Sequence, residues 1–438
     1  MKKSREIQAD AIVVGTGPGG ATVAKELTDL GKKVVMLERG RDHQFYGNFL
    51  GTALMADRMG FKWSREGVNV IRALTTGGST MIYGASAVPP PAWLKEKYRI
   101  DLDPYVAEAR KEIGVAPLPM DFIGDASKRI MDAAQRLGMN WAPVDKFINV
   151  EKCTRDCPCC MYGCRPGAKW TARDFAYQAR DKGAVLMNRA RVDRVIVENG
   201  RAVGVTADTP RGAVKVLADV VVVAAGGMGT PGILNRSGLD EAGRGFLGDP
   251  LIMSSGCADD YHGPGMYADI TMCCGTNDYL DDGILISDLL DPWPSYLLQL
   301  AYKGVGQIPR IIRHRRMLGV MCKVADTVGG RVYPDETFSK AMLDQDRKRL
   351  DRGVRLNEQI LQEAGCDPKS IVHTPVRLGH PGGTARIGHL VDTDLETQVK
   401  NLFVCDNSIT PEPYGLPPVL MLVAAAKRLV DRRLKAIV

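Results

Sequence analysis

The sequence predicts an α/β protein with two parts, one built on a parallel sheet and the other on a smaller sheet of its own. Three observations support this prediction. An apolar strand pattern near the N-terminus runs through a glycine-rich turn into an amphipathic helix. Glycine-rich turns occur again near residues 77 and 226, the second one directly after an apolar run. The chain has 438 residues, which is too long for one ordinary hydrophobic core.

Bulk composition excludes several classes of protein. Apolar residues make up 45% of the chain and charged residues 25%, as in soluble globular proteins. No run of about 18 uncharged apolar residues occurs, so no membrane-spanning helix is expected. The net charge of +7 is spread along the chain, which does not indicate a nucleic-acid partner. The first residues lack the pattern of a signal peptide or a twin-arginine leader, so we expect a cytoplasmic protein with reduced thiols.

Residues 11–38 carry the pattern of a dinucleotide-binding unit. Residues 11–14 are an apolar strand, and a helix with apolar residues at helical spacing follows the turn. A second apolar run, residues 34–37, ends at Glu38. The turn fills G-x-G-x-x-G with Gly15, Gly17 and Gly20. Strand, turn, helix, second strand and acid therefore occur in the order that a Rossmann-like domain requires.

Each of these residues has a physical role in binding a dinucleotide. Gly15 allows the tight turn, Gly17 lets the backbone approach a pyrophosphate, and Gly20 permits close packing of helix on strand. The amides at the helix N-terminus face the phosphates. Glu38 can accept hydrogen bonds from the adenosine ribose, so FAD or NAD fits better than NADP.

Further elements of the same domain are expected along the chain. Residues 77–79 form a second glycine-rich turn that can lie against a flat or anionic ligand. Asn199-Gly200 predicts a hairpin, and residues 220–224 predict a buried strand before the turn at Gly226. Asp406 is expected at the end of a further strand, and an apolar helix ends the chain. The predicted nucleotide-binding domain comprises 1–90, 180–245 and 375–438. The predicted second domain comprises 91–179, which includes the cysteine-rich segment 153–164, and 246–374.

Six segments together resemble the glucose–methanol–choline (GMC) family of FAD-dependent alcohol oxidases and dehydrogenases. They are "GTGPGG…LERG", "TTGGSTMIYG", "YGCRPGAKWTARDFAYQA", "AAGGMGTPGILNRSG", "HPGGTARIG" and "NLFVCDNSITPEPYGLPPVLMLVAAA". The resemblance implies non-covalently bound FAD, with a small sheet covering the flavin. It places Asp406 near the ribityl or pyrophosphate, residues 77–79 near the isoalloxazine and the backbone of Val192 at the adenine. The cofactor-binding residues that we predict are Gly15, Gly17, Gly19, Gly20, Glu38, Arg39, Gly77, Gly78, Ser79, Val192, Ala225, Gly226, Asp406 and Pro418.

The reaction that the resemblance implies is removal of two electrons from a small-molecule alcohol. A hydride passes to flavin N5 and the hydroxyl proton passes to a base, which in this family is a histidine of the "HPxGT" segment, here His380. Histidine suits proton abstraction near neutral pH.

The family normally has a second His or Asn that shares the substrate hydroxyl, and Pro417 stands at that place. Proline has no polar side-chain group and no N–H. Asn407, Tyr414 and Tyr83 are therefore candidate replacements, and His373 is a second candidate base.

Five cysteines lie between residues 153 and 164. Cys153, Cys157, Cys160 and Cys164 form C-x3-C-x2-C-x3-C, with Cys159 as an alternate ligand. Structural zinc sites usually separate two short pairs by a dozen or more residues, whereas iron–sulfur ligands often come in one compact run. Free cysteine also packs as a small hydrophobe. An iron–sulfur cluster, a packed thiol loop, and a zinc or redox-disulfide site are thus all open.

The segment is similar to one in bacterial glucose dehydrogenase catalytic subunits, which carry a cluster that takes electrons from FAD. It is also similar to a segment of long-chain alcohol oxidases. A cluster would imply a dehydrogenase with a non-oxygen acceptor, either a partner protein or a quinone.

Residues 291–321 mix aromatic and aliphatic side chains with basic residues, including Lys303 and Arg315. Such a segment can lie on an anionic membrane surface, or it can line a cavity with its basic face in water. Two alternatives to alcohol oxidation also stay open. One is a reductive or non-oxidative reaction on the same scaffold, favoured by Pro417. The other is an electron-transfer subunit of a larger redox complex, favoured by the cysteines.

Overall fold

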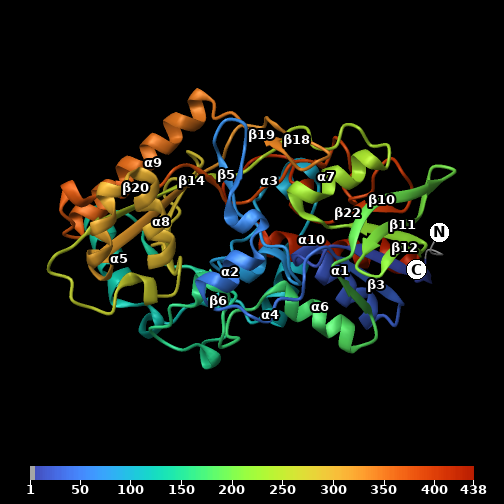
Figure 1. Cartoon of the computed structure of the whole chain (residues 1–438), viewed down its shortest axis with the longest axis horizontal. Helices are drawn as coiled ribbons and strands as arrows, with labels where there is room; N and C mark the ends of the chain where they lie inside the picture. The colour runs from blue at the N-terminus through green and yellow to red at the C-terminus, as the bar shows by residue number, and fades with distance from the viewer. Residues whose placement is uncertain (1–4) are drawn as a thin grey trace.

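The computed structural model describes residues 5–438, apart from the side chains of residues 295, 298, 299, 302, 303 and 307. Residues 1–4 and the side chain of Lys303, which belong to predicted regions, therefore lie outside the described residues. The chain folds into an elongated molecule with a β-sheet region at each end and loops and short helices between them (Figure 1).

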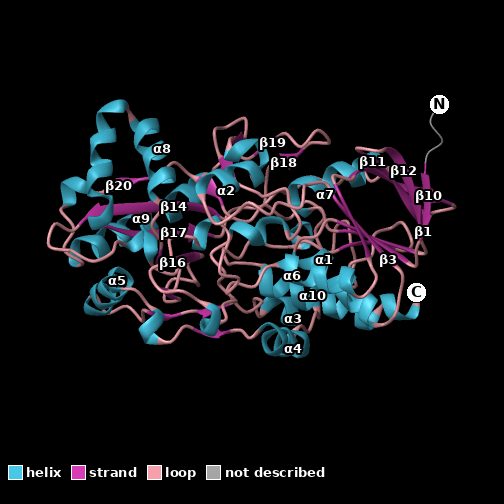
Figure 2. Ribbon diagram, turned by 60° about the horizontal axis from the view of Figure 1, so that its bottom comes forward, coloured by secondary structure: helices cyan, strands magenta, loops and turns pink. Residues whose placement is uncertain are grey.

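A five-stranded parallel sheet organises one end of the molecule, with strand order β22-β13-β2-β3-β9. Its central strands are continuous apolar runs that are buried throughout, because the sheet is covered on both faces. Three helices pack together over one of these faces (Figure 2). The strands are β2 (Ala11–Val14), β3 (Val34–Glu38), β9 (Val185–Asn188), β13 (Val220–Val223) and β22 (Leu402–Val404), and the helices are α1 (Pro18–Asp29), α6 (Ala172–Asp181) and α10 (Val419–Arg432).

A four-stranded sheet of order β1-β12-β11-β10 lies against the other face of the parallel sheet (Figure 2). The predicted hairpin is confirmed, because β10 and β11 pair antiparallel around Asn199-Gly200. Both turn residues have positive φ, 48° and 74°, as a type I′ turn requires. The four strands are β1 (Arg5–Gln8), β10 (Arg191–Glu198), β11 (Arg201–Thr209) and β12 (Gly212–Leu217).

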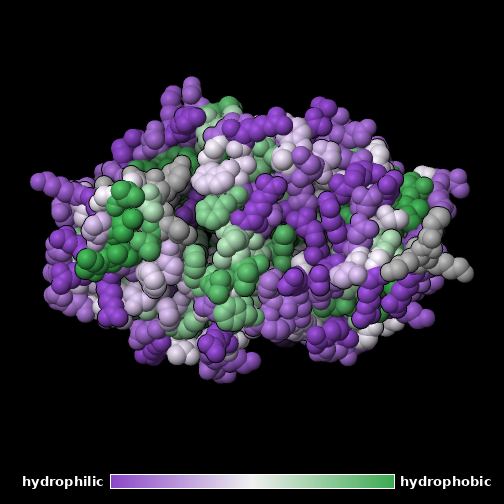
Figure 3. Space-filling view, in the orientation of Figure 1, coloured by the Kyte–Doolittle hydropathy of each residue, from purple (hydrophilic) through white to green (hydrophobic). Residues whose placement is uncertain are grey.

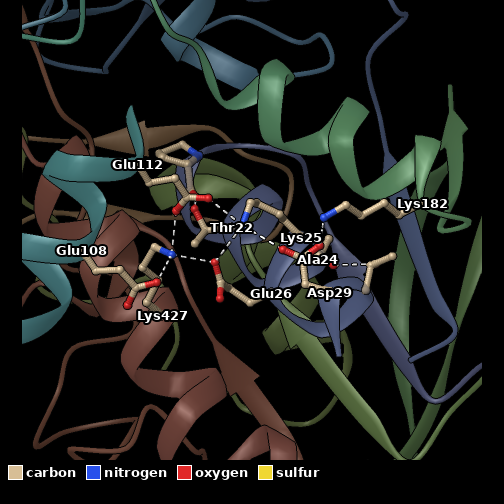
Figure 4. Close-up of polar contacts among 11 residues, drawn as sticks. Thr22, Ala24, Lys25, Glu26, Asp29, Glu108, Glu112, Lys182 and Lys427 are labelled. Atoms are coloured by element: carbon tan, nitrogen blue, oxygen red, sulfur yellow. Dashed lines mark hydrogen bonds and ion pairs between the residues drawn. The ribbon is translucent and has the colours of Figure 1, made fainter. Parts of the chain in front are cut away.

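A cluster of charged side chains joins α1 and α10 to α4 (Asp103–Ile113) (Figure 4). The ammonium of Lys427 lies 2.7 Å from carboxylate oxygens of Glu26, Glu108 and Glu112, and Lys25 lies 2.6 Å from Glu112. The three carboxylates lie close enough to hold a metal ion. Two lysine ammonium groups already neutralise them, so the cluster fastens the helices together.

A nine-stranded mixed sheet organises the other end, in the order β4-β5-β21-β14-β17-β16-β15-β7, with β20 beside β14. Helices α5 and α9 pack on it, and α8 lies at the same end (Figure 1). The long central strands are β14 (Pro250–Cys257) and β17 (Met317–Val324), and the helices are α5 (Asp125–Arg136), α8 (Trp293–Lys303) and α9 (Asp344–Glu363). The other strands are β4 (Lys62–Trp63), β5 (Asn69–Val70), β7 (Ala142–Pro143), β15 (Cys274–Thr276), β16 (Ile284–Asp288), β20 (Val372–His373) and β21 (Arg377–Leu378).

Short elements fill the middle of the molecule. They are α2 (Phe49–Met55), α3 (Trp93–Tyr98), α7 (Gly226–Arg236), the strand pairs β6 (Ala116–Pro117) with β8 (Asp145–Lys146) and β18 (Arg331–Val332) with β19 (Phe338–Ser339), and the 3-10 helices η2 (Gly78–Ile82), η5 (Cys160–Tyr162), η7 (Val305–Arg316) and η9 (Asn407–Ile409). No helix in the described part of the chain is both long and apolar enough to cross a bilayer.

The two ends exchange more segments of chain than the predicted domain ranges allow. Helix α4 and most of α6 lie within the range predicted for the second domain, yet they pack on α10 and α1 of the first. Strands β5 and β21 lie within ranges predicted for the first domain, yet they pair with each other in the nine-stranded sheet. The pattern of strands and glycine-rich turns in the sequence gives no information about these long-range contacts.

Candidate functional site

A cavity of about 410 Å³ lies between the two sheet regions. Its wall combines segments from near residue 14 to near residue 422, so the fold closes it with both halves of the chain. The predicted site residues in this wall are Gly15, Gly17, Gly19, Glu38, Arg39, Gly78, Ser79, Val192, Ala225, Gly226, His380, Asp406, Asn407 and Pro418. Three predicted residues, Gly20, Gly77 and Tyr414, are not among the described residues of the wall.

The glycines of the first turn separate into two kinds. A Cβ on Gly15, Gly19 or Gly20 would overlap a backbone carbonyl oxygen, so these glycines let the chain pack on itself. Gly17 differs, because a Cβ there would meet no protein atom within 4 Å. Its φ of −67° also suits any residue. The space beside Gly17 belongs to the cavity, which is what a pyrophosphate lying against the backbone requires.

Three helices begin at the cavity. The N-cap residues of α1, α7 and α10 are Gly17, Ala225 and Pro418, and all three lie in the wall. None of these N-cap residues provides a capping side chain, and none of the helices has an acidic residue in its first turn, although the Gly226 amide at the start of α7 already donates to Asp406. Their free amides and the positive ends of their dipoles favour negative charge. The site therefore fits the anionic pyrophosphate of FAD.

Two buried carboxylates hold the turns that form this site. Glu38 accepts hydrogen bonds from the Thr16 amide and hydroxyl, at 3.1 and 2.8 Å, and from the Gly40 amide at 2.7 Å. Asp406 accepts from the amides of Gly226 and Ser408 at 2.9 and 2.7 Å. Burial raises the pKa of both carboxyl groups. A carboxylate offers about four acceptor positions, so Glu38 retains room for a ribose hydroxyl.

An ion network that the sequence did not indicate lies in the same wall. Glu336 pairs with both Arg39 and Arg72, and Arg72 also pairs with Asp57 at 2.8 Å. Burial raises the pKa of Glu336, but the two arginines outweigh burial and lower it overall. Arg72 opens the second glycine-rich segment, which is a weak signal in the sequence. Glu336 lies in a distant turn and carries no signal.

His380 lies at the opposite side of the cavity, just after β21. Its Nδ1 is 3.0 Å from a carboxylate oxygen of Asp249 and 3.2 Å from the Lys323 ammonium nitrogen. These contacts occupy Nδ1 and leave Nε2 for a ligand. Burial and the Lys323 charge lower the pKa of His380, and Asp249 opposes them. The imidazole is therefore neutral near pH 7, as a base must be.

The Asp249 backbone is held in an unusual conformation. Its φ is 50°, in the left-handed region that few residues other than glycine adopt. The amides of Gly248 and Asp249 donate to the Asp326 carboxylate at 3.1 and 3.2 Å, and Asp326 is itself paired with the buried Lys340 at 2.6 Å. Such conformations persist where the surroundings enforce them, often in active sites. The buried pair thus fixes the residue that orients His380.

The candidate replacements for the missing second residue differ in their availability. The Asn407 amide donates to the carbonyls of His380 and Pro381, at 3.0 and 3.2 Å, and its oxygen accepts from Thr410 at 2.9 Å. Asn407 therefore holds the His380 turn in place, which differs from the predicted catalytic role. The Tyr83 hydroxyl donates to the Trp170 carbonyl at 2.6 Å and is equally engaged.

The remaining two candidates lie away from the cavity wall. The Tyr414 hydroxyl is buried and has no hydrogen-bond partner among the described residues. Burial and the nearby Asp249 charge raise the pKa of Tyr414 well above 10, so this phenol stays neutral. The Nδ1 of His373 lies 3.0 Å from the Ser254 hydroxyl, and its Nε2 lies 3.2 Å from Glu358. Neither residue is among the described residues that line the cavity.

The cavity beside His380 is apolar and rich in methionine. Pro417 lies in this part of the wall and offers no polar group. The apolar residues of the wall include Met161, Leu251, Met253, Met272, Leu289 and Met321. Methionine side chains adapt to irregular ligands, so this pocket suits a bulky or flexible apolar group.

Met161 belongs to the cysteine-rich segment, which therefore reaches the cavity. Each of its five cysteines is a free thiol. The Nζ of Lys169 donates to the carbonyls of Tyr83 and Cys160, at 2.8 and 2.9 Å, and the Nζ of Lys146 lies nearby. Burial raises the pKa of Cys160, and the two lysine charges oppose it. Thiols beside two buried lysines are the kind of donor set that an anionic metal–thiolate cluster uses. Among the described residues, however, no three cysteine sulfurs lie within 4.8 Å of one another.

Comparison with known proteins agrees with this architecture. An uncharacterized GMC-type oxidoreductase of Mycobacterium tuberculosis is 28% identical, over 98% of this chain and 76% of the relative. A long-chain-alcohol oxidase of Arabidopsis thaliana is 23% identical, over 96% of this chain and 67% of the relative. Formate oxidase of Aspergillus oryzae superposes with a TM-score of 0.74 at 15% identity, covering 99% of both chains. Pyridoxine 4-oxidase from Mesorbium loti superposes with a TM-score of 0.71 at 16% identity, covering 97% of this chain and 99% of the other.

Two regions of the chain match one family. Residues 9–253 match the N-terminal part of the GMC oxidoreductases, and residues 339–426 match their C-terminal part. The glycine-rich turn, the three uncapped helices and the histidine beside the cavity all lie in these regions or next to them. The chain therefore belongs to the GMC oxidoreductase family and is an FAD-dependent oxidoreductase.

Proposed function

We propose that this oxidoreductase oxidises an apolar alcohol, with His380 as the base. The observation that carries the proposal is the pairing of His380 with Asp249 at the edge of a methionine-lined pocket. The pocket and the base lie in the same wall, so a substrate whose apolar part fills the pocket can bring its hydroxyl to Nε2.

FAD and the residues of the protein would contribute different parts of the reaction. Gly17, Gly78 and the three helix N-termini would hold the FAD diphosphate and ring system, with Glu38 at the ribose and Val192 at the adenine. Bound FAD supplies the two-electron acceptor for the hydride that leaves the alcohol carbon. The protein's own residues bind the alcohol, exclude water from the pocket and manage the proton.

The proton step depends on the His380–Asp249 contact. Asp249 accepts a hydrogen bond from Nδ1–H, which favours the tautomer with a lone pair on Nε2. As the alcohol carbon loses its hydride, the hydroxyl proton moves to Nε2. The Asp249 carboxylate then stabilises the positive charge that the proton brings to His380 and its neighbour Lys323, much as the aspartate of a catalytic triad does. Asn407 keeps the ring in place through the backbone of the turn.

The substrate class follows from the pocket. Its methionine and leucine side chains offer neither charge nor hydrogen-bond donors, which favours an alcohol with an aliphatic or aromatic body. The Arabidopsis relative is named for long-chain alcohols. We therefore expect a primary alcohol of medium to long chain, or an aryl alcohol, to react better than a sugar.

The test is reduction of the bound flavin by a panel of alcohols without oxygen. We expect bleaching by apolar alcohols, and the His380→Asn variant should keep FAD but reduce it about 100-fold more slowly. The exposed His389 supplies a matched control, since His389→Asn should behave as the wild type. Flavin that no alcohol bleaches would overturn the proposal and favour a reductive or non-oxidative reaction.

A second part of the proposal concerns the electron acceptor. We expect the thiols of the cysteine-rich segment to hold an iron–sulfur cluster, with Cys153, Cys157, Cys160 and Cys164 as ligands and Cys159 as the alternate. The buried Lys146 and Lys169 beside Cys160 support an anionic group there. Such a cluster would supply one-electron transfer to a partner protein or quinone. Protein purified without oxygen should contain about three or four irons per flavin, whereas flavin without iron would leave a packed thiol loop.

Contact with a membrane or a redox partner through residues 291–321 is the last part of the proposal. Trp293, Val305 and Ile312 are 54%, 80% and 85% exposed, next to the exposed Arg313, Arg315 and Arg316. Figure 3 shows hydrophobic residues gathered over α8 on this face. Basic and apolar side chains together suit an anionic lipid surface, which would give a cytoplasmic protein with peripheral attachment. We expect co-sedimentation with anionic but not with neutral vesicles. Equal recovery with both kinds of vesicle would contradict contact with an anionic membrane through residues 291–321.

A further inference from the structure

Lys323 is a poorly satisfied buried lysine of the nine-stranded sheet. Its side chain is 1% exposed, yet the recorded hydrogen-bond partner of its Nζ is a single nitrogen, His380 Nδ1 at 3.2 Å. Its distance to the Asp249 carboxylate is 3.9 Å, beyond hydrogen-bond length. An ammonium group has three donors and needs acceptors for them when buried. Lys323 has one.

The other buried lysines are better provided. Lys25, Lys340 and Lys427 each pair with a carboxylate at 2.6 or 2.7 Å, and Lys62 faces Asp57 at 3.5 Å. Lys146 and Lys169 each donate to at least two carbonyl oxygens. Burial lowers the pKa of Lys146 to about 8 as well, so the partners rather than the pKa distinguish Lys323. The oxygen acceptors around the other lysines suit an ammonium, whereas the single nitrogen partner of Lys323 also accommodates a neutral amine.

The contacts of His380 Nδ1 make the two partners compete. Asp249 accepts a hydrogen bond and requires a proton on Nδ1, while the Lys323 ammonium donates and requires a lone pair there. Nδ1 cannot satisfy both at once. The choice decides whether Nε2, which remains for the substrate, carries a lone pair or a proton.

We infer that Lys323 is a positioning residue that exchanges a proton with His380 through Nδ1 and thereby switches the base on and off. While Lys323 is an ammonium, it donates to Nδ1, and Nε2 carries the imidazole proton and cannot act as a base. When Lys323 is a neutral amine, Nδ1 carries the proton and Nε2 is free. This inference rests on the proposed alcohol oxidation only in assigning the reaction that the switch controls.

The proton transfers of the active form balance. The substrate O–H bond breaks and an Nε2–H bond forms, while the O–H electron pair stays on oxygen and forms the carbonyl as the hydride leaves carbon. The Nδ1–H bond breaks and an Nζ–H bond forms on Lys323. The imidazole ends neutral in its other tautomer, and the new ammonium lies beside Asp249. No imidazolium has to form 3.2 Å from a cation.

The neighbouring charged groups are compatible with this exchange. Burial lowers the pKa of Lys323 to about 8, against the opposing effect of Asp249, so both forms are accessible near neutral pH. Asp326 is neutralised by Lys340, and the nearby phenol of Tyr414 stays protonated. Pro417 has no polar group, and the side chain of Asn407 is already engaged. The polar side chains that contact the His380 ring are therefore Lys323, in the cavity wall, and Asp249.

Nitrogen NMR of ¹⁵N-histidine-labelled apoprotein tests the switch without any turnover. The His380 signals, assigned by their loss in His380→Asn, should change from the Nε2–H to the Nδ1–H tautomer with a midpoint near pH 8. In Lys323→Met the change near pH 8 should vanish, leaving the Nδ1–H tautomer that Asp249 favours. Absence of a tautomer change in the wild-type protein would overturn the inference, whether or not the variants fold.

Kinetics of flavin reduction then separate a switch from a static charge. In the wild type the rate should rise as pH increases through about 8. Lys323→Arg places a permanent cation at Nδ1, so it should be at least 10-fold slower than Lys323→Met at pH 9. A lysine needed only for its charge would give the reverse order, with arginine restoring activity.

A matched control and a separate outcome complete the test. Lys427→Met removes another buried lysine far from His380 and should leave the pH profile of the rate unchanged. A wild-type protein that shows the tautomer change but is not reduced by any alcohol would contradict the proposed function and leave the switch standing. Reduction of the flavin by alcohols without a tautomer change would support the proposed function and contradict the switch.

Discussion

At the scale of single residues, the site depends on a chain of contacts that runs from a buried ion pair to the base. Lys340 neutralises Asp326, Asp326 holds the amides of Gly248 and Asp249, and Asp249 meets His380. Lys340, Asp326 and Asp249 are buried and His380 is partly buried, so these interactions act at a lower local dielectric and are stronger than they would be at the surface.

Replacing Asp249 by asparagine tests the link next to the base. Asp249→Asn removes the charge that favours Nδ1–H and stabilises the proton taken from the substrate, so flavin reduction should slow by about 10²- to 10⁴-fold while FAD content stays the same. Because Asp249 raises the pKa of His380, its loss should also move the acidic limb of the rate profile to lower pH. Stopped-flow reduction across pH measures both effects. Asp260→Asn, at an exposed aspartate, is the control, and a change below about 10-fold would contradict this role.

The residue-scale predictions come from local motifs. His380 and the glycines of the first turn are recognisable because their neighbours in sequence are also their neighbours in space. Lys323 and Asp249 were missed, since they reach His380 only through the pairing of β14 with β17 and β21. A lysine in the otherwise apolar strand "MLGVMCKV" was the available signal.

At the scale of elements, the start of α1 offers two glycines with different functions. Gly17→Val places a side chain in the ligand space without a protein clash, so it should weaken FAD binding by about 1–3 kcal/mol, or roughly 5- to 150-fold. The stability of the apoprotein should be unaffected. Gly19→Ala should instead destabilise the apoprotein, because its Cβ would overlap the Cys405 carbonyl.

Flavin titration and urea unfolding of the two apoprotein variants distinguish these effects. Equal loss of FAD affinity and of apoprotein stability in both variants would show that Gly17 serves packing rather than the ligand.

The junction of α1, α4 and α10 predicts a stability effect away from the cavity. Lys427→Met leaves Glu26, Glu108 and Glu112 without their shared ammonium and should lower the free energy of unfolding by about 2 kcal/mol, since the carboxylates are partly exposed. Urea unfolding measures this loss. Lys435→Met removes an exposed pair and should change stability by less than about 1 kcal/mol. An equal effect of both substitutions would argue against a structural role for the cluster.

The same cluster sets the sign of a pH effect. Burial raises the pKa of Glu112, but Lys25 and Lys427 outweigh burial and lower it below 4.5. Its contribution to stability is therefore complete above about pH 4.5 and is lost as the pH falls through the lowered value. Lys427→Met should be less sensitive to acid in this range.

Element prediction worked for segments with a local period and failed for those defined by packing. The strands, first helix and hairpin of the parallel-sheet region follow the predicted pattern, since burial on both faces demands continuous apolar runs. The attachment of α4 and α6 to that region depends on the helix partners α10 and α1, which lie far away in sequence. No window of sequence contains both members of such a pair.

At the scale of the whole molecule, the cavity is a joint between two sheet regions. FAD that binds only the folded chain should stabilise it by about 2.7 kcal/mol at a free concentration 100 times Kd. Hydrogen exchange should show protection rising together at 11–38, 317–324 and 402–422 when FAD is added to the apoprotein. Protection confined to 11–38 would mean that the parallel-sheet region binds the cofactor by itself.

The convergence of three helix starts on one cavity also constrains how the protein is made. The first of these helices begins at Pro18 and the last at Val419, so the ribosome delivers the two ends of the cofactor cradle about 400 residues apart. At 5–20 residues per second, synthesis of 438 residues takes roughly 20–90 s. During that interval the nascent chain exposes an incomplete cavity with an apolar lining. The complete cradle therefore exists only after the start of α10 has been synthesised, and cells short of riboflavin should accumulate this protein as a chaperone client.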